Sequence, residues 1–231
     1  MPPIRLFLTT LAVVGSLASA VHAQTTLVSF TFEGTATAAI GASRATLSWN
    51  SGGAEGYVGT LFNGQGQALS IGNFQNGEYF QLTLDASGFS GITLADFRAN
   101  GSASAPRDWK ISYSLAGTSG TFVDATTYTL ASNTASNTTT IGGFDLPSGA
   151  DDNSSIVLRL IATSSNRVDG AGGGANGTVR LDNFVITGTA IPEPAPTALL
   201  AGLAVLALAW RRRVAPAAKQ KGPPDGGPAS L

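Results

Sequence analysis

Apolar and polar residues alternate with a period of two along most of the chain between residues 24 and 190. This alternation is typical of strands that bury one face, and Gly, Asn, Asp and Ser separate the runs as they do in turns. The predicted strands cover residues 27–32, 45–49, 79–84, 92–99, 109–115, 121–130, 138–144, 156–163 and 178–187. No part of this region keeps a helical period for three turns. We therefore predict an all-β fold, a two-sheet sandwich of about eight or nine antiparallel strands.

The first 23 residues form a separate segment. Arg5 precedes an apolar run over residues 6–17, and small residues lead to a cleavage position between Ala23 and Gln24, with an alternative after Ala20. The run is too short to span a bilayer well. This favours a secretory signal peptide, with its signal helix, over a permanent N-terminal anchor.

A second apolar stretch, residues 195–210, lies near the other end of the chain. It is flanked by two polar motifs, Pro192-Glu193-Pro194 before it and Arg211-Arg212-Arg213 after it. A helix of this length would measure roughly 24 Å, against a hydrocarbon core of about 30 Å. A buried helix is disfavoured because an all-round apolar helix closed by three arginines has no core to enter. We predict a C-terminal transmembrane helix whose arginines stay on the cytoplasmic side.

This order of features resembles the PEP-CTERM sorting signal, found in Gram-negative bacteria that make exopolysaccharide. The resemblance covers residues 191–213 and implies recognition by an exosortase-type membrane protease that cuts near the Pro-Glu-Pro motif. It also implies export across the inner membrane and a place at the cell surface or in the extracellular matrix, with transient membrane anchoring. The chain departs from the family in residues 214–231, a Pro- and Gly-rich tail that we expect to be disordered.

Composition removes several classes of function. The chain has no cysteine, which excludes disulfides and thiolate chemistry. Its single histidine, His22, lies in the predicted signal peptide, so the mature protein would lack His-dependent triads and the common zinc sites. Acids outnumber cations between residues 24 and 190, and a nucleic-acid partner is therefore not expected. The acids are scattered singly through turns, which predicts that the protein is not an enzyme.

The body between the two ends resembles the jelly-roll domains often found upstream of PEP-CTERM signals. Residues 30–34, 109–114 and 181–188 carry the likeness, with residues 79–84 as a weaker fourth segment. These domains are similar in layout to galactose-binding-like and carbohydrate-binding modules, so the resemblance implies a jelly-roll sandwich. Our main hypothesis is a non-catalytic surface or matrix protein associated with exopolysaccharide. The alternative is a carbohydrate-binding module proper with a structural calcium, and a glycan-acting hydrolase comes third.

Two candidate sites follow from the residues. The first and last strands of such sandwiches commonly lie side by side, which would bring Glu33 and Asp182 together on one Ca²⁺ ion with backbone carbonyls. Modules of the resembled type often bind calcium with residues at matching positions. Alternatively, Glu33 is solvated and Asp182 caps a turn. Trp49 and Tyr57 flank a Gly-rich loop and are the candidate sugar-binding rings, with core packing as their alternative role.

Overall fold

The structure is a computed structural model of the chain, and it describes residues 23–58, 66–130, 139–193, 202–207 and 210. Two compact units are present, Met1–Ile191 and Pro192–Leu231. The described part of the first unit contains fourteen strands: β1 (Gln24–Phe30), β2 (Ala45–Trp49), β3 (Glu55–Val58), β4 (Ala68–Phe74), β5 (Tyr79–Leu84), β6 (Phe89–Leu94), β7 (Phe97–Gly101), β8 (Asp108–Ser114), β9 (Val123–Thr129), β10 (Thr139–Ile141), β11 (Phe144–Asp145), β12 (Ile156–Ala162), β13 (Gly177–Asp182) and β14 (Phe184–Ala190). One 3-10 turn, Ser148–Ala150, precedes β12.

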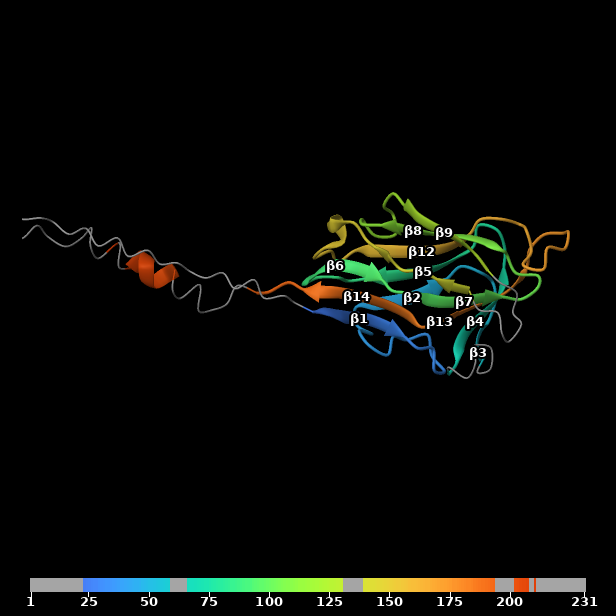
Figure 1. Ribbon diagram of the computed structural model, residues 1–231, viewed down its shortest axis with the longest axis horizontal. Helices are drawn as coiled ribbons and strands as arrows, with labels where there is room; N and C mark the ends of the chain where they lie inside the picture. Colours follow the sequence, from blue (N-terminus) through green and yellow to red (C-terminus); the bar gives the residue numbers. More distant parts are fainter. Residues whose placement is uncertain (1–22, 59–65, 131–138, 194–201, 208–209, 211–231) are drawn as a thin grey trace, which may run out of the picture. The chain divides into compact units, whose positions relative to one another are not determined.

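The strands form three sheets in which every neighbouring pair is antiparallel. Sheet I has the order β2-β5-β12-β8-β9, sheet II the order β10-β7-β13-β4-β3, and sheet III the order β1-β14-β6-β11. The first and last strands, β1 and β14, lie side by side (Figure 1). Sheets II and III share two chain crossings, because β13 continues into β14 through one residue and β6 into β7 through two.

The core lies between sheet I and the other two sheets. Alternate residues of β5 and β12 point inward, so that Leu82 faces Leu158 and Phe80 faces Leu160 across the ladder. Phe30 and Phe184 of sheet III belong to the same buried cluster. Burying one such side chain stabilises the fold by roughly 1.5–3 kcal/mol. The sandwich therefore rests on one continuous apolar core and needs no disulfide.

The prediction of an all-β sandwich is confirmed, whereas the predicted eight or nine strands in two sheets are wrong for the described residues. The run over residues 178–187 is broken at Asn183, whose φ of 54° lies in the left-handed region and ends β13. The run over residues 92–99 is also divided, by two residues between β6 and β7. In addition, β3 and β4 lie outside the predicted runs. Short strands and breaks of one or two residues thus turn a two-sheet pattern into three sheets.

Nothing in the described residues forms a helix long and apolar enough to cross a membrane. The helical residues described in the second unit are 202–207 and 210. The predicted signal helix falls on residues 1–22, outside the described residues. Pro194, Arg211, Arg212, Arg213 and the tail over residues 214–231 also lie outside them. Ala23 and Gln24 are described, and both are exposed, Gln24 as the first residue of β1.

Candidate functional site

A polar row crosses the whole outer face of sheet I. It consists of Ser48, Gln81, Arg159, Ser112 and Asp124, which are direct register partners on β2, β5, β12, β8 and β9. The row exists because side chains alternate across a strand, so the residues between the core positions all point outward. Five strands at about 4.8 Å spacing make the row roughly 19 Å long. The sheet therefore carries a line of polar side chains, of which Ser112 is completely buried and the other four are exposed or partly exposed.

Arg159 lies at the centre of this polar row and is held on three sides. Its Nε donates to Oε1 of Gln81 at 2.8 Å. Its guanidinium carbon lies 4.4 Å from the ring centroid of Tyr79 and 4.0 Å from that of Phe122. Such cation–π contacts are worth about 0.5–1 kcal/mol each where they are exposed. The arginine thus fixes two aromatic rings beside the row.

The far end of the polar row is an ion pair. The hydroxyl of Ser112 donates to Asp124 at 2.6 Å, and Nζ of Lys110 lies 3.0 Å from the same carboxylate. The hydrogen bond from Ser112, followed by that from Lys110, lowers the pKa of Asp124 below its usual value. Asp124 is thus ionised at neutral pH, and its oxygens are directed at protein donors.

A groove of about 280 Å³ lies beside the polar row. Its floor includes Thr46 of β2, Thr83 of β5 and Val157 of β12, and Thr83 is the direct register partner of the other two. Gly117 and Ser155 are among its walls. The floor therefore combines hydroxyl groups with apolar surface. A sugar ring has the same two kinds of group, hydroxyls and apolar C–H faces.

Trp49 and Tyr57 lie on the edge strands of two different sheets, β2 and β3. Both rings are half-buried and pack partly against the core. Trp49 lines a second groove, of about 410 Å³, together with Glu55, and the hydroxyl of Tyr57 donates to the Glu55 carboxylate. This second groove and the first share Ala45 and Thr46. Trp49 and Tyr57 are thus neither exposed platforms nor pure core, and their predicted role in sugar binding stays a prediction.

Glu33 and Asp182 lie close enough for their charges to interact. Asp182 ends β13 with only 1% of its surface exposed, and its carboxylate accepts hydrogen bonds from the backbone N–H and the Nδ2 of Asn183. The pKa of Asp182 is raised to about 6, chiefly by burial and to a smaller extent by the charge of Glu33, while the backbone hydrogen bond from Asn183 and the charge of Arg98 act to lower it. In the described part of the chain no cation lies within 4 Å of Asp182. A buried carboxylate beside a second one is an arrangement that a bound cation would stabilise.

Each of these two acids is next in sequence to a residue with a left-handed backbone. Phe32, directly before Glu33, has a φ of 55° although it is fully buried, and Asn183, directly after Asp182, has a φ of 54°. A left-handed backbone at a bulky residue costs roughly 1–3 kcal/mol and tends to occur where a site imposes it. Among the described residues, no three His, Cys, Asp or Glu side chains are grouped so that they could hold a metal ion by themselves. A cation held here would therefore complete its shell with backbone carbonyls and water.

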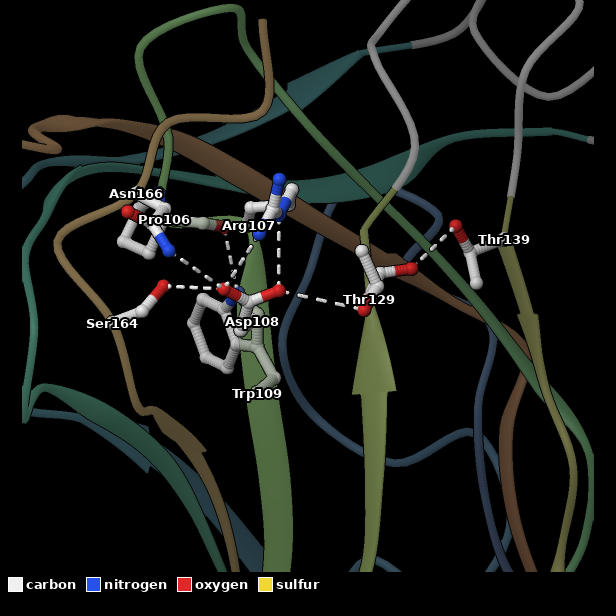
Figure 2. A network of polar contacts seen from close by, with 8 residues as sticks. All are labelled: Pro106, Arg107, Asp108, Trp109, Thr129, Thr139, Ser164 and Asn166. Atoms are coloured by element: carbon white, nitrogen blue, oxygen red, sulfur yellow. Dashed lines mark hydrogen bonds and ion pairs between the residues drawn. The ribbon is translucent and has the colours of Figure 1, made fainter. Parts of the chain in front are cut away.

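A separate polar network surrounds Asp108 at the start of β8 (Figure 2). The Asp108 carboxylate accepts hydrogen bonds from Arg107 at 3.0 Å and Ser164 at 2.8 Å, while Nε1 of buried Trp109 donates to the carbonyl of Pro106 at 2.8 Å. The hydrogen bond from Arg107 is the largest cause that lowers the pKa of Asp108. These contacts fasten the loop after β12 to β8. The network is structural, and Trp109 belongs to the core.

Comparisons with known proteins identify the fold. No family model matches the chain, and no curated protein matches it in sequence. The N-terminal CBM22-1-CBM22-2 tandem domain of Xyn10C from Paenibacillus barcinonensis superposes with a TM-score of 0.50 at 20% identity, covering 77% of this chain and 50% of that one. The CBM22-1 xylan-binding domain of the same protein gives 0.49 at 18% identity, covering 75% of this chain and all of that one. Structural neighbours of this sandwich are thus carbohydrate-binding jelly-roll modules.

Proposed function

We propose that the chain is a glycan-binding module and that its ligand lies on the outer face of sheet I. The observation that carries the proposal is the polar row beside a groove with a mixed hydroxyl and apolar floor. The likeness in fold to carbohydrate-binding modules supports it. Of the alternatives drawn from the sequence, this one agrees best with the structure.

The geometry suits a chain of sugars better than a single one. The row is roughly 19 Å long, which matches several sugar units. Gln81 and Ser48 offer side-chain polar groups to sugar hydroxyls, and Thr83 adds a hydroxyl inside the groove. Tyr79 and Phe122 supply apolar ring surface, which sugars contact through their C–H faces. Trp49 is the register partner of inward-facing Phe80 and therefore lies on the other face of β2, but it lines the second groove at this edge, which shares Ala45 and Thr46 with the first. We extend the proposed surface around the β2 edge to Trp49 and Tyr57.

Binding is tested with the purified protein and a panel of neutral polysaccharides, by affinity electrophoresis and then calorimetry. We expect retardation by at least one β-linked polymer, and a loss of about tenfold or more in affinity for the double variant Gln81→Ala/Thr83→Val, because two hydrogen-bonding groups are removed. The matched control, Gln75→Ala/Thr187→Val, makes the same chemical changes in an exposed turn and on β14. Equal loss in both variants, or no binding by the native protein, would refute the proposal.

We further propose a structural Ca²⁺ held by Glu33 and Asp182. Two carboxylates without nitrogen or sulfur donors suit a hard cation, and Asp182 is buried with a raised pKa and no protein cation in contact among the described residues. The ion would supply positive charge that offsets the repulsion between the carboxylates. It would tie the residues after β1 to the end of β13 and would act on stability.

The targeting of the chain is a proposal that rests on its sequence. We propose export, removal of residues 1–23, and sorting by an exosortase-type protease at Pro192-Glu193-Pro194, with retention near exopolysaccharide and no catalytic activity. Mass spectrometry of the protein from its native host tests this. A mature chain that begins at Gln24 and ends near Pro192 is the expected result. A chain that retains residues 1–231 would contradict it.

A further inference from the structure

Two charged side chains, Arg44 and Asp85, line the groove beside the polar row of sheet I. Arg44 directly precedes β2 and Asp85 directly follows β5, so each lies two residues from a threonine of the groove floor, Thr46 or Thr83. Because side chains alternate across a strand, both charged residues share the outer face with those threonines. The backbone N–H of Asp85 donates to the carbonyl of Arg44 at 2.7 Å, which places the two residues side by side. Both side chains are partly exposed, so a ligand in the groove can reach them.

The two charges are neighbours but do not form an ion pair. Nη1 of Arg44 donates to the backbone carbonyls of Asp85 at 3.3 Å and Ser87 at 3.1 Å, and the guanidinium carbon lies 5.0 Å from the ring centroid of Phe89. Oδ1 of Asp85 accepts the backbone N–H of Ser87 at 2.9 Å. Within the described ranges no carboxylate lies within 4 Å of the Arg44 guanidinium. Each charged group is thus held in place by the backbone and not by the other charge.

The Asp85 carboxylate is ionised at neutral pH. Hydrogen bonds from Ser87, first from its side chain and then from its backbone, lower the pKa of Asp85, and the charge of Arg44 lowers it further. The groove therefore contains a full negative charge next to a full positive one. A guanidinium only donates hydrogen bonds and an ionised carboxylate only accepts them.

This combination defines the chemistry of the ligand that fits it. An anion would be attracted by Arg44 and repelled by Asp85, and a cation would meet the opposite pair of effects. A neutral group satisfies both side chains if it offers an acceptor and a donor side by side. Two hydroxyls on neighbouring carbon atoms do so at a fixed spacing, since one accepts from Arg44 and the other donates to Asp85.

We propose that Arg44 and Asp85 hold one sugar unit of the bound glycan through a pair of hydroxyls on neighbouring ring carbons. This inference rests on the proposed function, because it concerns the same groove, and it adds the class of glycan. The ligand is a neutral polymer whose linkages leave adjacent hydroxyls free. A 1,4-linked pyranose keeps its hydroxyls at carbons 2 and 3, whereas a 1,3-linked one keeps only hydroxyls that are not adjacent.

The test compares linkages in the full protein, by affinity electrophoresis and then calorimetry. The probes are three 1,4-linked polymers, xylan, glucomannan and galactan, and a soluble 1,3-linked glucan. We expect at least one 1,4-linked polymer to bind about tenfold or more tightly than the 1,3-linked glucan, because hydrogen bonds to two charged groups depend on the adjacent hydroxyls. Acetylation of that polymer should abolish the advantage, and removal of the acetyl groups with alkali should restore it.

Two variants assign the effect to the charged residues. Asp85→Asn and Arg44→Met should each lower the affinity for the 1,4-linked polymer by about tenfold and so remove most of the preference between linkages. Asp85→Asn keeps the shape of the side chain and can still accept the N–H of Ser87, so it remains informative if Arg44→Met does not fold. The matched controls are Asp145→Asn, an exposed acid outside the groove, and Arg107→Met, which removes an arginine from the Asp108 network. Both controls should keep the preference.

Three results would overturn the inference. They are equal affinity of the native protein for 1,4-linked and 1,3-linked polymers, an unchanged linkage preference in Asp85→Asn, and an equal loss of preference in the controls. Any of these leaves the proposed function standing if Gln81→Ala/Thr83→Val still loses affinity. Absence of binding by the native protein to every polymer would instead refute the proposed function and this inference with it.

Discussion

Replacing Asp182 by Asn removes a negative charge that the folded protein keeps almost completely from water. The side chain keeps its shape and still accepts the backbone N–H of Asn183 through Oδ1. Its second hydrogen bond, from Asn183 Nδ2 at 3.1 Å, is lost because Asn presents an NH₂ group there. The substitution therefore removes one hydrogen bond and also removes the unfavourable free energy of burying a charge.

The magnitude follows from the pKa. Burial raises the pKa of Asp182 from 3.8 to about 6. Between these values the folded protein binds more protons than the unfolded chain, so the contribution of Asp182 to the free energy of unfolding falls as pH rises from about 4 to about 6. Two pKa units correspond to about 3 kcal/mol, from which the lost hydrogen bond subtracts about 1 kcal/mol. Without metal, Asp182→Asn should be about 2 kcal/mol more stable than the native protein at pH 7.5, and no more stable at pH 4.

Calcium should reverse this order. A ligand that binds the folded state at one hundred times its dissociation constant adds about 2.7 kcal/mol to stability. That stabilisation requires the Asp182 carboxylate, so the native protein gains it at pH 7.5 and Asp182→Asn does not. For a domain of this size 1 kcal/mol corresponds to roughly 2–4 °C in melting temperature.

The assay is urea unfolding followed by circular dichroism at pH 7.5 and 4, with EDTA, with calcium and with magnesium. Asp145→Asn is the matched control, since Asp145 is exposed and far from Asp182 in sequence. Refutation takes one of two forms. Either Asp182→Asn destabilises the EDTA-treated protein equally at both pH values, or calcium stabilises the native protein and Asp182→Asn to the same extent.

Three further predictions follow from single contacts. Asn183→Ala should lower the free energy of unfolding by about 1–2 kcal/mol in urea titrations, because a Cβ-bearing residue without a side-chain amide occupies a left-handed position; Asn183→Gly should cost less, and equal losses would show that the backbone strain is irrelevant. Asp108→Asn should flatten the loss of stability as pH falls below about 4, since the folded pKa of Asp108 is lowered and its contribution disappears when it is protonated; an unchanged acid limb in thermal melts would contradict this. Trp49→Ala should weaken binding of the neutral polymer by about tenfold, as loss of a stacking ring does, while Trp49→Phe retains most of it; unchanged affinity in Trp49→Ala would assign Trp49 to packing alone.

The strands that bury one face fully could be predicted from the sequence. In β5 every second residue is a large apolar one, so the period of two is clear, whereas β12 is a short and nearly continuous apolar run interrupted by Arg159. By contrast, β4 has Gly72 and a left-handed Asn73 near its end, which shortens its apolar pattern. No Gly or Pro marks the break at Asn183, and a turn capped by Asp182 was considered only as the alternative to a continuous strand. The local pattern of apolar and polar residues thus indicates which side chains are buried, but it does not indicate where the backbone adopts a left-handed conformation.

Sequence reasoning reached the candidate sites unequally. Glu33 and Asp182 could be placed near each other because the first and last strands of a sandwich commonly pair, and β1 and β14 do. The assignment to those strands was wrong, because Glu33 lies three residues beyond β1 and Asp182 ends β13. The polar row of sheet I was missed, since its members lie on five strands and each alone resembles an ordinary solvent-facing residue. Only the register brings Gln81 opposite Arg159 and Arg159 opposite Ser112.

The place of β14 between β1 and β6 has a mechanical consequence. The chain leaves the sandwich at Ala190, so a force applied to this end along the axis of β14 would load that strand directly. Such a load shears the hydrogen bonds to both neighbouring strands at once, whereas a load at the edge strand β2 would open its bonds one after another. A sandwich anchored through its C-terminal end should therefore resist mechanical unfolding well. The force would act on β14, which is hydrogen-bonded to a neighbouring strand on both sides.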